Sequence, residues 1–210
     1  MKSLAILGAG GHAKVIADAA LCSRWQQVTF FDDNWPQNNT IGPWKISGNT
    51  ESLITQLSEF DGVIIAIGNN VIRLEKIAHF MKESIPLATV IHPSAVVSRY
   101  AVVAQGSVVF ANAVINPDSH IGLGAIINTG ATVDHDCILG DAVHVSPGAN
   151  LAGGVCVGDL SWIGIGSAVK QRVKIGNKVI VGAGAVVVND IPDDCTVVGI
   201  PAKILSSKSE

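Results

Sequence analysis

An aliphatic residue recurs at every sixth position through the second half of the chain, and no polar residue interrupts the series. The series slips by one residue after position 114 and resumes at position 121. Its members are Val96, Val102, Val108, Val114, Ile121, Ile127, Val133, Leu139, Val145, Leu151, Val157, Ile163, Val169, Ile175, Val181 and Val187. A period of six fits neither an α-helix nor a hairpin meander, but it is typical of the hexapeptide repeats of a parallel β-helix. We therefore predict short strands, three to a triangular coil of about eighteen residues, with the aliphatic residue pointing inward.

The first ninety residues show a different pattern, in which short apolar strands alternate with helical segments. Strands are expected at 3–7, 27–31 and 62–67, and helices at 14–23, 52–58 and 71–82. Residues 34–49 read as loop or short irregular strand. The alternation predicts a small parallel α/β unit. The expected domains are 1–90 (α/β), 91–190 (β-helix) and 191–210 (a C-terminal tail).

Composition excludes several classes of partner. The net charge is −3 and no basic run occurs, so neither nucleic acid nor an anionic membrane is expected. No segment reaches the ~18 unbroken apolar residues of a membrane span. The four cysteines form no CxxC motif, which argues against a zinc site and a disulfide framework. No signal-peptide pattern precedes the first strand, so we expect a cytoplasmic protein.

A glycine-rich turn follows the first strand and opens the first helix. It reads Gly8-Ala9-Gly10-Gly11-His12-Ala13, and Asp32 lies at the end of the next strand. Such a turn lets backbone N–H groups approach a phosphate. The α/β unit is long enough for one Rossmann-like half domain, which favours a nucleotide-linked or phosphorylated sugar over a dinucleotide. A turn that only packs helix on strand is the alternative.

Loops at the carboxyl ends of parallel strands meet at one crevice. The glycine turn, Asp32-Asp33 and Gly68-Asn69 all follow predicted strands. We therefore expect these three segments to lie together and to form the nucleotide-binding site.

Within the repeats, His135 stands out because it lies between Asp134 and Asp136, with His144 nine residues later. A carboxylate neighbour can orient a histidine and raise its basicity, as a general base requires. A solvent-facing turn histidine is the alternative. The eighteen-residue coil places His135 below Gly153 and His144 below Trp162.

The two histidines are half a coil apart and should face different sides of one prism. Two subunits would then supply them to one site, most simply in a trimer. The same offset argues against a metal held by His135, Asp136 and His144, so no metal is expected.

Six segments together resemble one known family. They are GAGGHAKV, FFDD, AIGN, VDHD, HVSPGANLAGGV and GIPAK. In combination they are similar to the sialic acid O-acetyltransferases and UDP-4-amino-sugar (bacillosamine) N-acetyltransferases (NeuD/PglD-like), and the resemblance covers residues 1–205. It implies an α/β half domain followed by a left-handed parallel β-helix, a homotrimer, acetyl-CoA as the donor, and a nucleotide-linked amino sugar or a sialic acid as the acceptor.

The resemblance also implies roles for individual residues. His135 would be the general base, with Asp136 raising its basicity. Because the family more often carries Glu at this place, Asp134 is an alternative partner of the ring. His144 would contact the acetyl-CoA end, while Gly153 and Ile165 would line the groove for acetyl-CoA. The positions that match the nucleotide-sugar site are Gly10, Gly11, His12, Asp32, Asp33 and Gly68.

Three functions follow as alternatives. The first is N-acetylation of a UDP- or dTDP-linked 4-amino sugar for surface glycan synthesis, and the second is O-acetylation of a sialic acid or related glycan. The third is a non-catalytic trimeric scaffold that binds nucleotide sugar. The repeat register from Ile121 to Val187 leaves no room for a loop that folds over the acceptor, so the α/β domain is expected to hold it.

Overall fold

The computed structural model describes residues 2–205. The chain forms two compact units, of which the first ends at Pro93 and the second begins at Ser94. Each unit has its own hydrophobic core.

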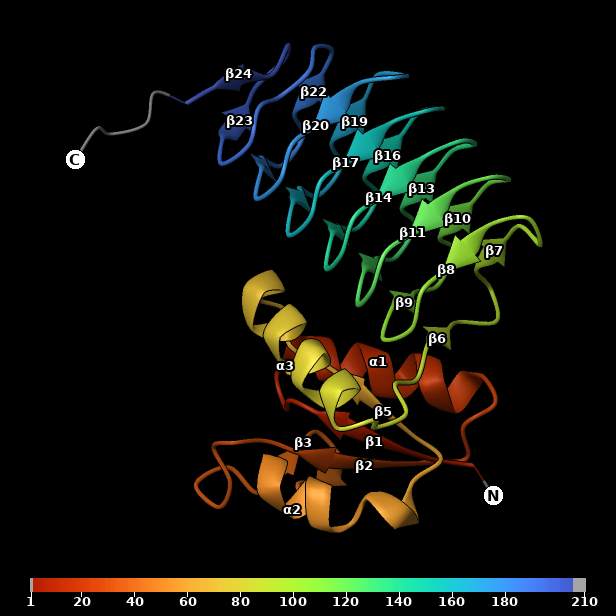
Figure 1. Ribbon diagram of the computed structural model, residues 1–210, viewed down its shortest axis with the longest axis vertical. Helices are drawn as coiled ribbons and strands as arrows, with labels where there is room; N and C mark the ends of the chain where they lie inside the picture. The colour runs from red at the N-terminus through yellow and green to blue at the C-terminus, as the bar shows by residue number, and fades with distance from the viewer. Residues whose placement is uncertain (1, 206–210) are drawn as a thin grey trace. The chain divides into compact units, whose positions relative to one another are not determined.

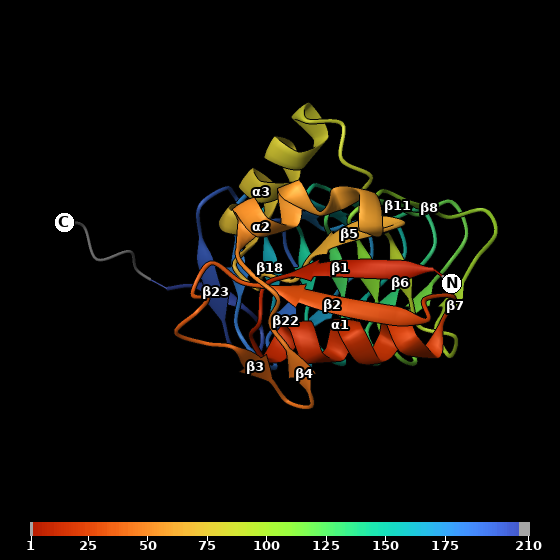
Figure 2. The same cartoon turned by 90° about the horizontal axis from the view of Figure 1, so that it is seen from below.

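The first unit is built on a parallel sheet of three strands in the order β2-β1-β5 (Figure 2). Its helices α1 and α2 lie on opposite faces of this sheet (Figure 1). The element bounds are β1 Ser3–Leu7, α1 Gly11–Cys22, β2 Gln27–Phe31, β3 Thr40–Ile41, β4 Trp44–Lys45, α2 Thr50–Thr55, a 3₁₀ turn Leu57–Glu59, β5 Gly62–Ile65, α3 Asn70–Lys82 and β6 Val90–Ile91.

Local sequence explains these elements. The three sheet strands are almost wholly apolar, and Leu53 of α2 and Phe80 of α3 pack with Ala5 and Leu7 of β1 in one core. Asparagine side chains cap the N-termini of α2 and α3. No side chain caps α1, which follows Gly10, so no side-chain oxygen accepts a hydrogen bond from the first N–H groups of that helix.

The second unit is a parallel β-helix whose two-residue strands stack coil upon coil into parallel sheets (Figure 1). Along one sheet the order is β22-β19-β16-β13-β10-β7, along the next β20-β17-β14-β11-β8, and along the third β23-β21-β18-β15-β12-β9. The bounds are β7 Val96–Val97, β8 Val102–Val103, β9 Val108–Val109, β10 Val114–Ile115, β11 His120–Ile121, β12 Ile126–Ile127, β13 Thr132–Val133, β14 Ile138–Leu139, β15 His144–Val145, β16 Asn150–Leu151, β17 Cys156–Val157, β18 Trp162–Ile163, β19 Ala168–Val169, β20 Lys174–Ile175, β21 Ile180–Val181, β22 Val186–Val187, β23 Thr196–Val198 and β24 Lys203–Ile204. The predicted fold class, an α/β half domain followed by a parallel β-helix, is confirmed.

The predicted slip in the repeat does not exist. Ile115 pairs with Val133, eighteen residues on, as Ile121 pairs with Leu139. The inward residues of the first four strands are Val97, Val103, Val109 and Ile115, which continue the register of Ile121 backwards without a break. Val96 and Val102 are instead 64% and 53% exposed. The prediction failed here because both residues of each early strand are aliphatic, so the sequence does not show which one points inward.

A second six-residue period lies at the corners of the coils. Each of these corner positions has a positive φ. They are Gly106, Asn112, Asp118, Gly124, Gly130, Asp136, Ala142, Gly148, Gly154, Leu160, Gly166, Arg172, Lys178 and Gly184. Glycine, Asn and Asp tolerate this left-handed conformation best. Asp136 is thus one of the corner residues.

Residues 191–204 of the predicted C-terminal tail include two strands that belong to the β-helix unit. Its strand β23 pairs in parallel with β21, and β24 pairs antiparallel with β23. Hydrogen bonding through these strands therefore continues the third sheet. Residues 206–210 of the predicted tail lie outside the described part of the chain.

Candidate active site

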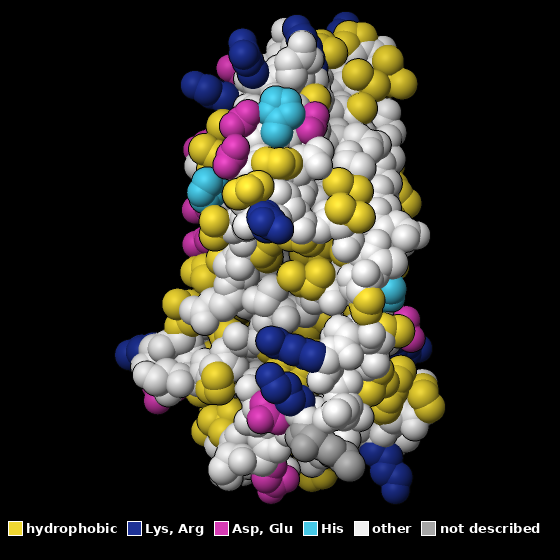
Figure 3. All heavy atoms as spheres, turned by 90° about the vertical axis from the view of Figure 1, so that its right-hand side faces the viewer, with side chains coloured by type: hydrophobic (Ala, Val, Ile, Leu, Met, Phe, Trp, Pro, Cys, Tyr) yellow, Lys and Arg dark blue, Asp and Glu magenta, His cyan; other side chains and the backbone are white. Residues whose placement is uncertain are grey.

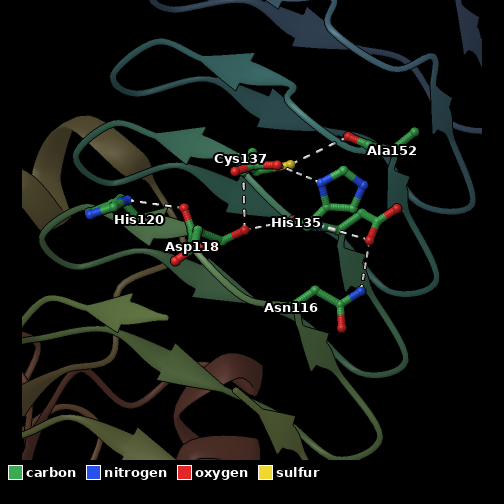
Figure 4. Close-up of polar contacts among 9 residues, drawn as sticks. Asn116, Asp118, His120, His135, Cys137 and Ala152 are labelled. Carbon is green, nitrogen blue, oxygen red and sulfur yellow. Dashed lines mark hydrogen bonds and ion pairs between the residues drawn. The ribbon is translucent and has the colours of Figure 1, made fainter. Parts of the chain in front are cut away.

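His135 lies on the turn between β13 and β14, and its side chain is open to solvent. Its Nδ1 is 2.6 Å from Oδ2 of Asp136 (Figure 4). Because a carboxylate can only accept, Nδ1 carries the proton, and Nε2 of the neutral ring has a free lone pair. The other carboxylate, Asp134, accepts the backbone N–H of His135 and the side-chain amide of Asn116, each at 2.8 Å. Asp136 is therefore the partner of the ring, and Asp134 is the partner of the backbone.

These carboxylates make the imidazole more basic. The hydrogen bond that His135 donates to Asp136 and the negative charge of Asp134 raise the pKa of His135 above its ordinary value. The backbone N–H of His135 and the Asn116 amide lower the pKa of Asp134. In the solenoid, at the top of Figure 3, histidine side chains lie beside carboxylates on the exposed surface.

Ser119, in the preceding coil, forms hydrogen bonds that stabilise the same turn. This buried hydroxyl donates to the carbonyl of Asp134 at 2.6 Å and accepts the N–H of Cys137 at 3.2 Å. Burial raises the pKa of the Cys137 thiol, so this sulfur is a poor nucleophile at neutral pH. Ser119 thus fixes the backbone on both sides of His135.

Gly153 lies against the His135 ring, as the eighteen-residue coil predicts. A Cβ built on Gly153 would lie 2.6 Å from both Cε1 and Nε2 of the imidazole. The N–H of the next residue, Gly154, donates to the His135 carbonyl at 2.8 Å. Any side chain at position 153 would therefore displace the imidazole.

His144 lies on β15, in a different sheet from the strands that flank His135. It is buried, and its Nε2 accepts a hydrogen bond from Asn128 Nδ2 at 3.1 Å. The centroids of its ring and of the Trp162 ring are 4.1 Å apart. The predicted stacking of His144 below Trp162 is confirmed by strand pairing. The two histidines therefore face different sides of the prism.

A groove of about 350 Å³ runs along the sheet that carries His144. Its lining is mainly apolar and includes Ile165. The other lining residues are Ser146, Pro147, Trp162, Gly164, Ile180, Val181, Gly182 and Ala183. The structure thus brings His144 and Ile165 together, while Gly153 belongs to the His135 corner.

In the first unit, a crevice of about 400 Å³ lies at the carboxyl ends of the strands. Gly10, Asp32 and Gly68 line it, so the predicted convergence of three loops is confirmed. Asp32 accepts the N–H of Ala9 at 2.7 Å and thereby holds the glycine turn. Gly8 has a φ of +114°, and a Cβ there would lie 2.8 Å from the Ala66 carbonyl. Close contact between two loops therefore requires this glycine.

The other predicted nucleotide-site residues do not line this crevice. Asp33 accepts the N–H of Thr50 and pairs with Lys76 Nζ at 2.9 Å, so its carboxylate joins α2 to α3. Gly11 is the first residue of α1. Burial and the nearby charge of Arg73 lower the pKa of His12 to about 4. His12 is therefore neutral at physiological pH.

Sequence reasoning missed three residues of this region. Asn34 and Asn38 line the crevice and come from the loop after β2. Arg73 is almost completely buried, and its guanidinium donates to the carbonyls of Ile67 at 2.9 Å and Gly68 at 3.0 Å. Arg73 could have been identified from the sequence, because it follows AIGN closely and lies on the apolar face of the helix predicted there.

Residues 2–205 contain no candidate metal site and no candidate membrane span. There, no group of three or more His, Cys, Asp or Glu side chains could hold a metal ion. None of the helices in that range is long and apolar enough to cross a bilayer.

Comparison with known proteins links both units to sugar acetyltransferases. Residues 3–80 match the PglD N-terminal domain family. UDP-N-acetylbacillosamine N-acetyltransferase of Bacillus subtilis (strain 168) is 38% identical over 115 residues, which are 52% of this chain and 51% of the relative. The chain thus aligns with about half the length of that curated relative.

Solved structures match nearly the whole chain. The acetyltransferase domain of PglB from Neisseria gonorrhoeae FA1090, in complex with acetyl coenzyme A, is 42% identical with a TM-score of 0.93, covering 97% of this chain and 99% of that one. PerB from Caulobacter crescentus, in complex with CoA and GDP-perosamine, is 39% identical with a TM-score of 0.92, covering 98% of each chain. The chain therefore belongs to the PglD-like family of hexapeptide-repeat acetyltransferases.

Proposed function

We propose that this protein transfers the acetyl group of acetyl-CoA to the amino group of a nucleotide-linked amino sugar, in the cytoplasmic synthesis of a surface glycan. The observation that carries this proposal is the His135 corner. There Asp136 fixes the proton on Nδ1 at 2.6 Å, which leaves Nε2 as the basic atom. The similarity to structures that contain CoA with an amino-sugar nucleotide supports the substrate class.

In the proposed reaction, His135 acts as the general base. Nε2 takes a proton from the amine as its nitrogen bonds to the acetyl carbonyl carbon. The C–S bond then breaks, and CoA leaves as the thiol with the proton that Nε2 of His135 had taken. Asp136 stabilises the imidazolium that forms on His135.

The N–H of Gly153 is available to stabilise the developing oxyanion. Within the described chain this N–H donates to no other group, whereas its neighbour Gly154 donates to His135. A backbone donor fixed in a folded coil needs no reorganisation when charge develops nearby. Its contact with the ring supports a role for Gly153 beside the base.

The groove beside His144 has the properties expected of the acetyl-CoA site. It is long, mainly apolar and bordered by Ile165 and Trp162, which suits an extended pantetheine chain. Gly164 and Gly182 let the coils that line it stack closely, because a Cβ at either would collide with the following coil. Acetyl-CoA would supply the activated acetyl thioester.

We propose a homotrimer for a geometric reason. His135 lies on the turn between β13 and β14, whereas His144 lies on the third sheet of the same prism. The groove of one prism and the imidazole of another can meet when prisms pack side by side around a three-fold axis. Analytical ultracentrifugation tests this directly, and a monomer at assay concentrations would contradict it.

The crevice of the α/β unit is the proposed nucleotide site. The uncapped N-terminus of α1 offers N–H groups to a diphosphate. Asp32 is placed at the end of β2, where a carboxylate of this fold accepts ribose hydroxyls. Gly10, Gly11, His12, Asp33 and Gly68 complete the segments proposed to shape this site.

A free-thiol release assay with acetyl-CoA tests the proposed function. The acceptor panel contains UDP-, dTDP- and GDP-linked 4-amino sugars together with free sialic acid. We expect thiol release with at least one amino sugar nucleotide. Release with sialic acid alone would instead establish O-acetylation, and no release with any acceptor would favour the scaffold.

His135→Ala tests the base. We expect kcat to fall by roughly 10² to 10⁴, the usual contribution of a general base. His120→Ala is the matched control, because His120 is an exposed histidine on the neighbouring strand β11 and contacts only a backbone oxygen, that of Asp118 (Figure 4). Equal activity of the two variants would remove His135 from the mechanism.

A further inference from the structure

A second groove of the solenoid, of about 410 Å³, lies on the sheet that contains β10, β13 and β16. Unlike the groove beside His144, it has several polar side chains in its lining. These are Asn116, Thr132, Asp134 and Asn150. Asp134 directly precedes His135, so this groove borders the proposed catalytic base.

Most of the polar atoms in this groove already have partners. Thr132 Oγ1 donates to Asn150 Oδ1 at 2.8 Å, and Asn150 Nδ2 donates to the carbonyl of Gly148 at 2.8 Å. Asn116 Nδ2 donates to Asp134 Oδ1, which also accepts the N–H of His135. These bonds hold the side chains in place without a ligand.

Two oxygens remain. In the described structure Asp134 Oδ2 and Asn116 Oδ1 accept no hydrogen bond from any protein group. Both are acceptors, and the hydrogen bond from the Asn116 amide to Asp134 Oδ1 holds the two side chains together. The lowered pKa of Asp134 keeps its carboxylate negative at neutral pH. The groove therefore presents two acceptor oxygens and one negative charge.

This chemistry matches a primary ammonium group. An ammonium has three N–H donors, no acceptor and a positive charge, whereas a sugar hydroxyl has one donor and no charge. Primary aliphatic amines with lysine-like pKa values are mostly protonated at neutral pH. A phosphate or carboxylate would be repelled by Asp134.

We propose that Asp134 and Asn116 form the subsite that binds the acceptor's amino group, as its ammonium, beside His135. This inference rests on the proposed function and deepens it, because it names the groups that select an amine over a hydroxyl. Before attack the ammonium loses one proton to solvent, and Nε2 of His135 takes the second proton as the C–N bond forms. Asp134 is then a substrate-binding residue as well as a support for the His135 backbone.

Asp134→Asn tests the charge while keeping the shape and Oδ1. We expect KM for the amino sugar nucleotide to rise roughly 10- to 100-fold, as expected for the loss of a charge-assisted hydrogen bond. KM for acetyl-CoA should stay unchanged. The control is Asp118→Asn, an exposed aspartate at a left-handed corner of the preceding coil, which should leave both KM values unchanged.

A purely structural role for Asp134 gives a different result. If this residue only held the backbone of His135, Asp134→Asn would lower kcat and leave KM for the amino sugar unchanged, and that outcome would overturn the inference. As a second measurement, an acceptor analogue with a hydroxyl in place of the amine is used as a competitive inhibitor. We expect its inhibition constant to be the same in wild type and in Asp134→Asn, and an equal loss for amine and hydroxyl would also overturn the inference.

The proposed function and the ammonium subsite are contradicted by different results. If the wild-type protein acetylates no amino sugar nucleotide, the proposed function is wrong. If the wild type is active and Asp134→Asn keeps the wild-type KM for the amine, only the ammonium subsite is wrong.

Discussion

The imidazole of His135 rests on the backbone of Gly153 in the following coil, with no room for a methyl group between them. A Cβ at position 153 would lie 2.6 Å from two ring atoms, well inside van der Waals contact. On its other side the ring is tied to Asp136. The orientation of His135 on which the proposed reaction relies therefore depends on one glycine and one carboxylate.

Gly153→Ala should displace the imidazole and leave the fold intact. We expect kcat to fall about 10²-fold, the effect of moving a reacting group by about 1 Å. Steady-state kinetics with circular dichroism as a fold check measures this. Gly148→Asn is the control, because a Cβ at Gly148 meets no atom within 4 Å and Asn tolerates its φ of +65°. Wild-type kcat in Gly153→Ala would show that the ring does not need this contact.

Asp136→Asn should change the dependence of the rate on pH. Because Asp136 raises the pKa of His135, the wild-type base is available only above a pH higher than that of an ordinary histidine. Activity should therefore fall as the pH drops through this raised pKa. Without the carboxylate the falling limb should move to lower pH, and the maximal kcat should drop because the base is weaker.

A kcat profile from pH 5 to pH 9 measures this shift. Asp118→Asn provides the comparison, since Asp118 occupies the same kind of left-handed corner but contacts a histidine ring, that of His120, through its backbone carbonyl and not through its carboxylate. If kcat of Asp136→Asn falls at the same acidic pH as kcat of the wild type, Asp136 is not the partner of the ring.

Ser119→Ala should cost both stability and activity. Its hydroxyl satisfies a buried carbonyl and a buried N–H next to His135, and leaving them unpaired costs about 1–3 kcal/mol. Ser107 makes the same pair of bonds, to the Gly122 carbonyl and the Ala125 N–H. Chemical denaturation should therefore show similar losses for Ser119→Ala and Ser107→Ala, while only Ser119→Ala lowers kcat. Equal kcat in the two variants would mean that the turn holds His135 without the serine.

Arg73 should control binding of the nucleotide sugar and not acetyl transfer. It holds the carbonyls of Ile67 and Gly68, both of which line the α/β crevice. Arg73→Lys keeps the charge but loses the forked geometry, so we expect KM for the nucleotide sugar to rise about 10-fold, the value of one hydrogen bond to a charged group. KM for acetyl-CoA and kcat should stay near wild type. A parallel rise in both KM values would point to a general loss of folding instead.

The repeat was predictable because its physics is local. An inward aliphatic residue every six positions is required by each coil, and the pairing at eighteen residues follows from three strands per coil. The inward-pointing residue was not predictable in strands such as Val96–Val97, where both residues are aliphatic. Burial decides between them, and burial depends on neighbours that only the folded coil supplies.

The site divides in the same way. The segment from Asp134 to Asp136 can be recognised in the sequence as a candidate site, because two carboxylates flank a histidine. Which carboxylate bonds to the ring depends on the left-handed backbone at Asp136, a property of the corner and not of the residue type. Asn116 lies one coil, 18 residues, before the carboxylate that it holds, and Arg73 lies 6 residues after Ile67. Spacing brings these groups near each other, but the residue types alone do not show which side chain makes the hydrogen bond.

The unbroken register from Val97 to Val187 also constrains how this solenoid can change in length. Deleting or inserting one residue would move every later aliphatic residue out of its inward position and every later left-handed residue off its corner. Removing one whole coil of eighteen residues, cut at the same corner in two successive coils, would instead keep the inward register of the remaining coils. Natural or engineered variants of the prism should therefore differ by complete turns.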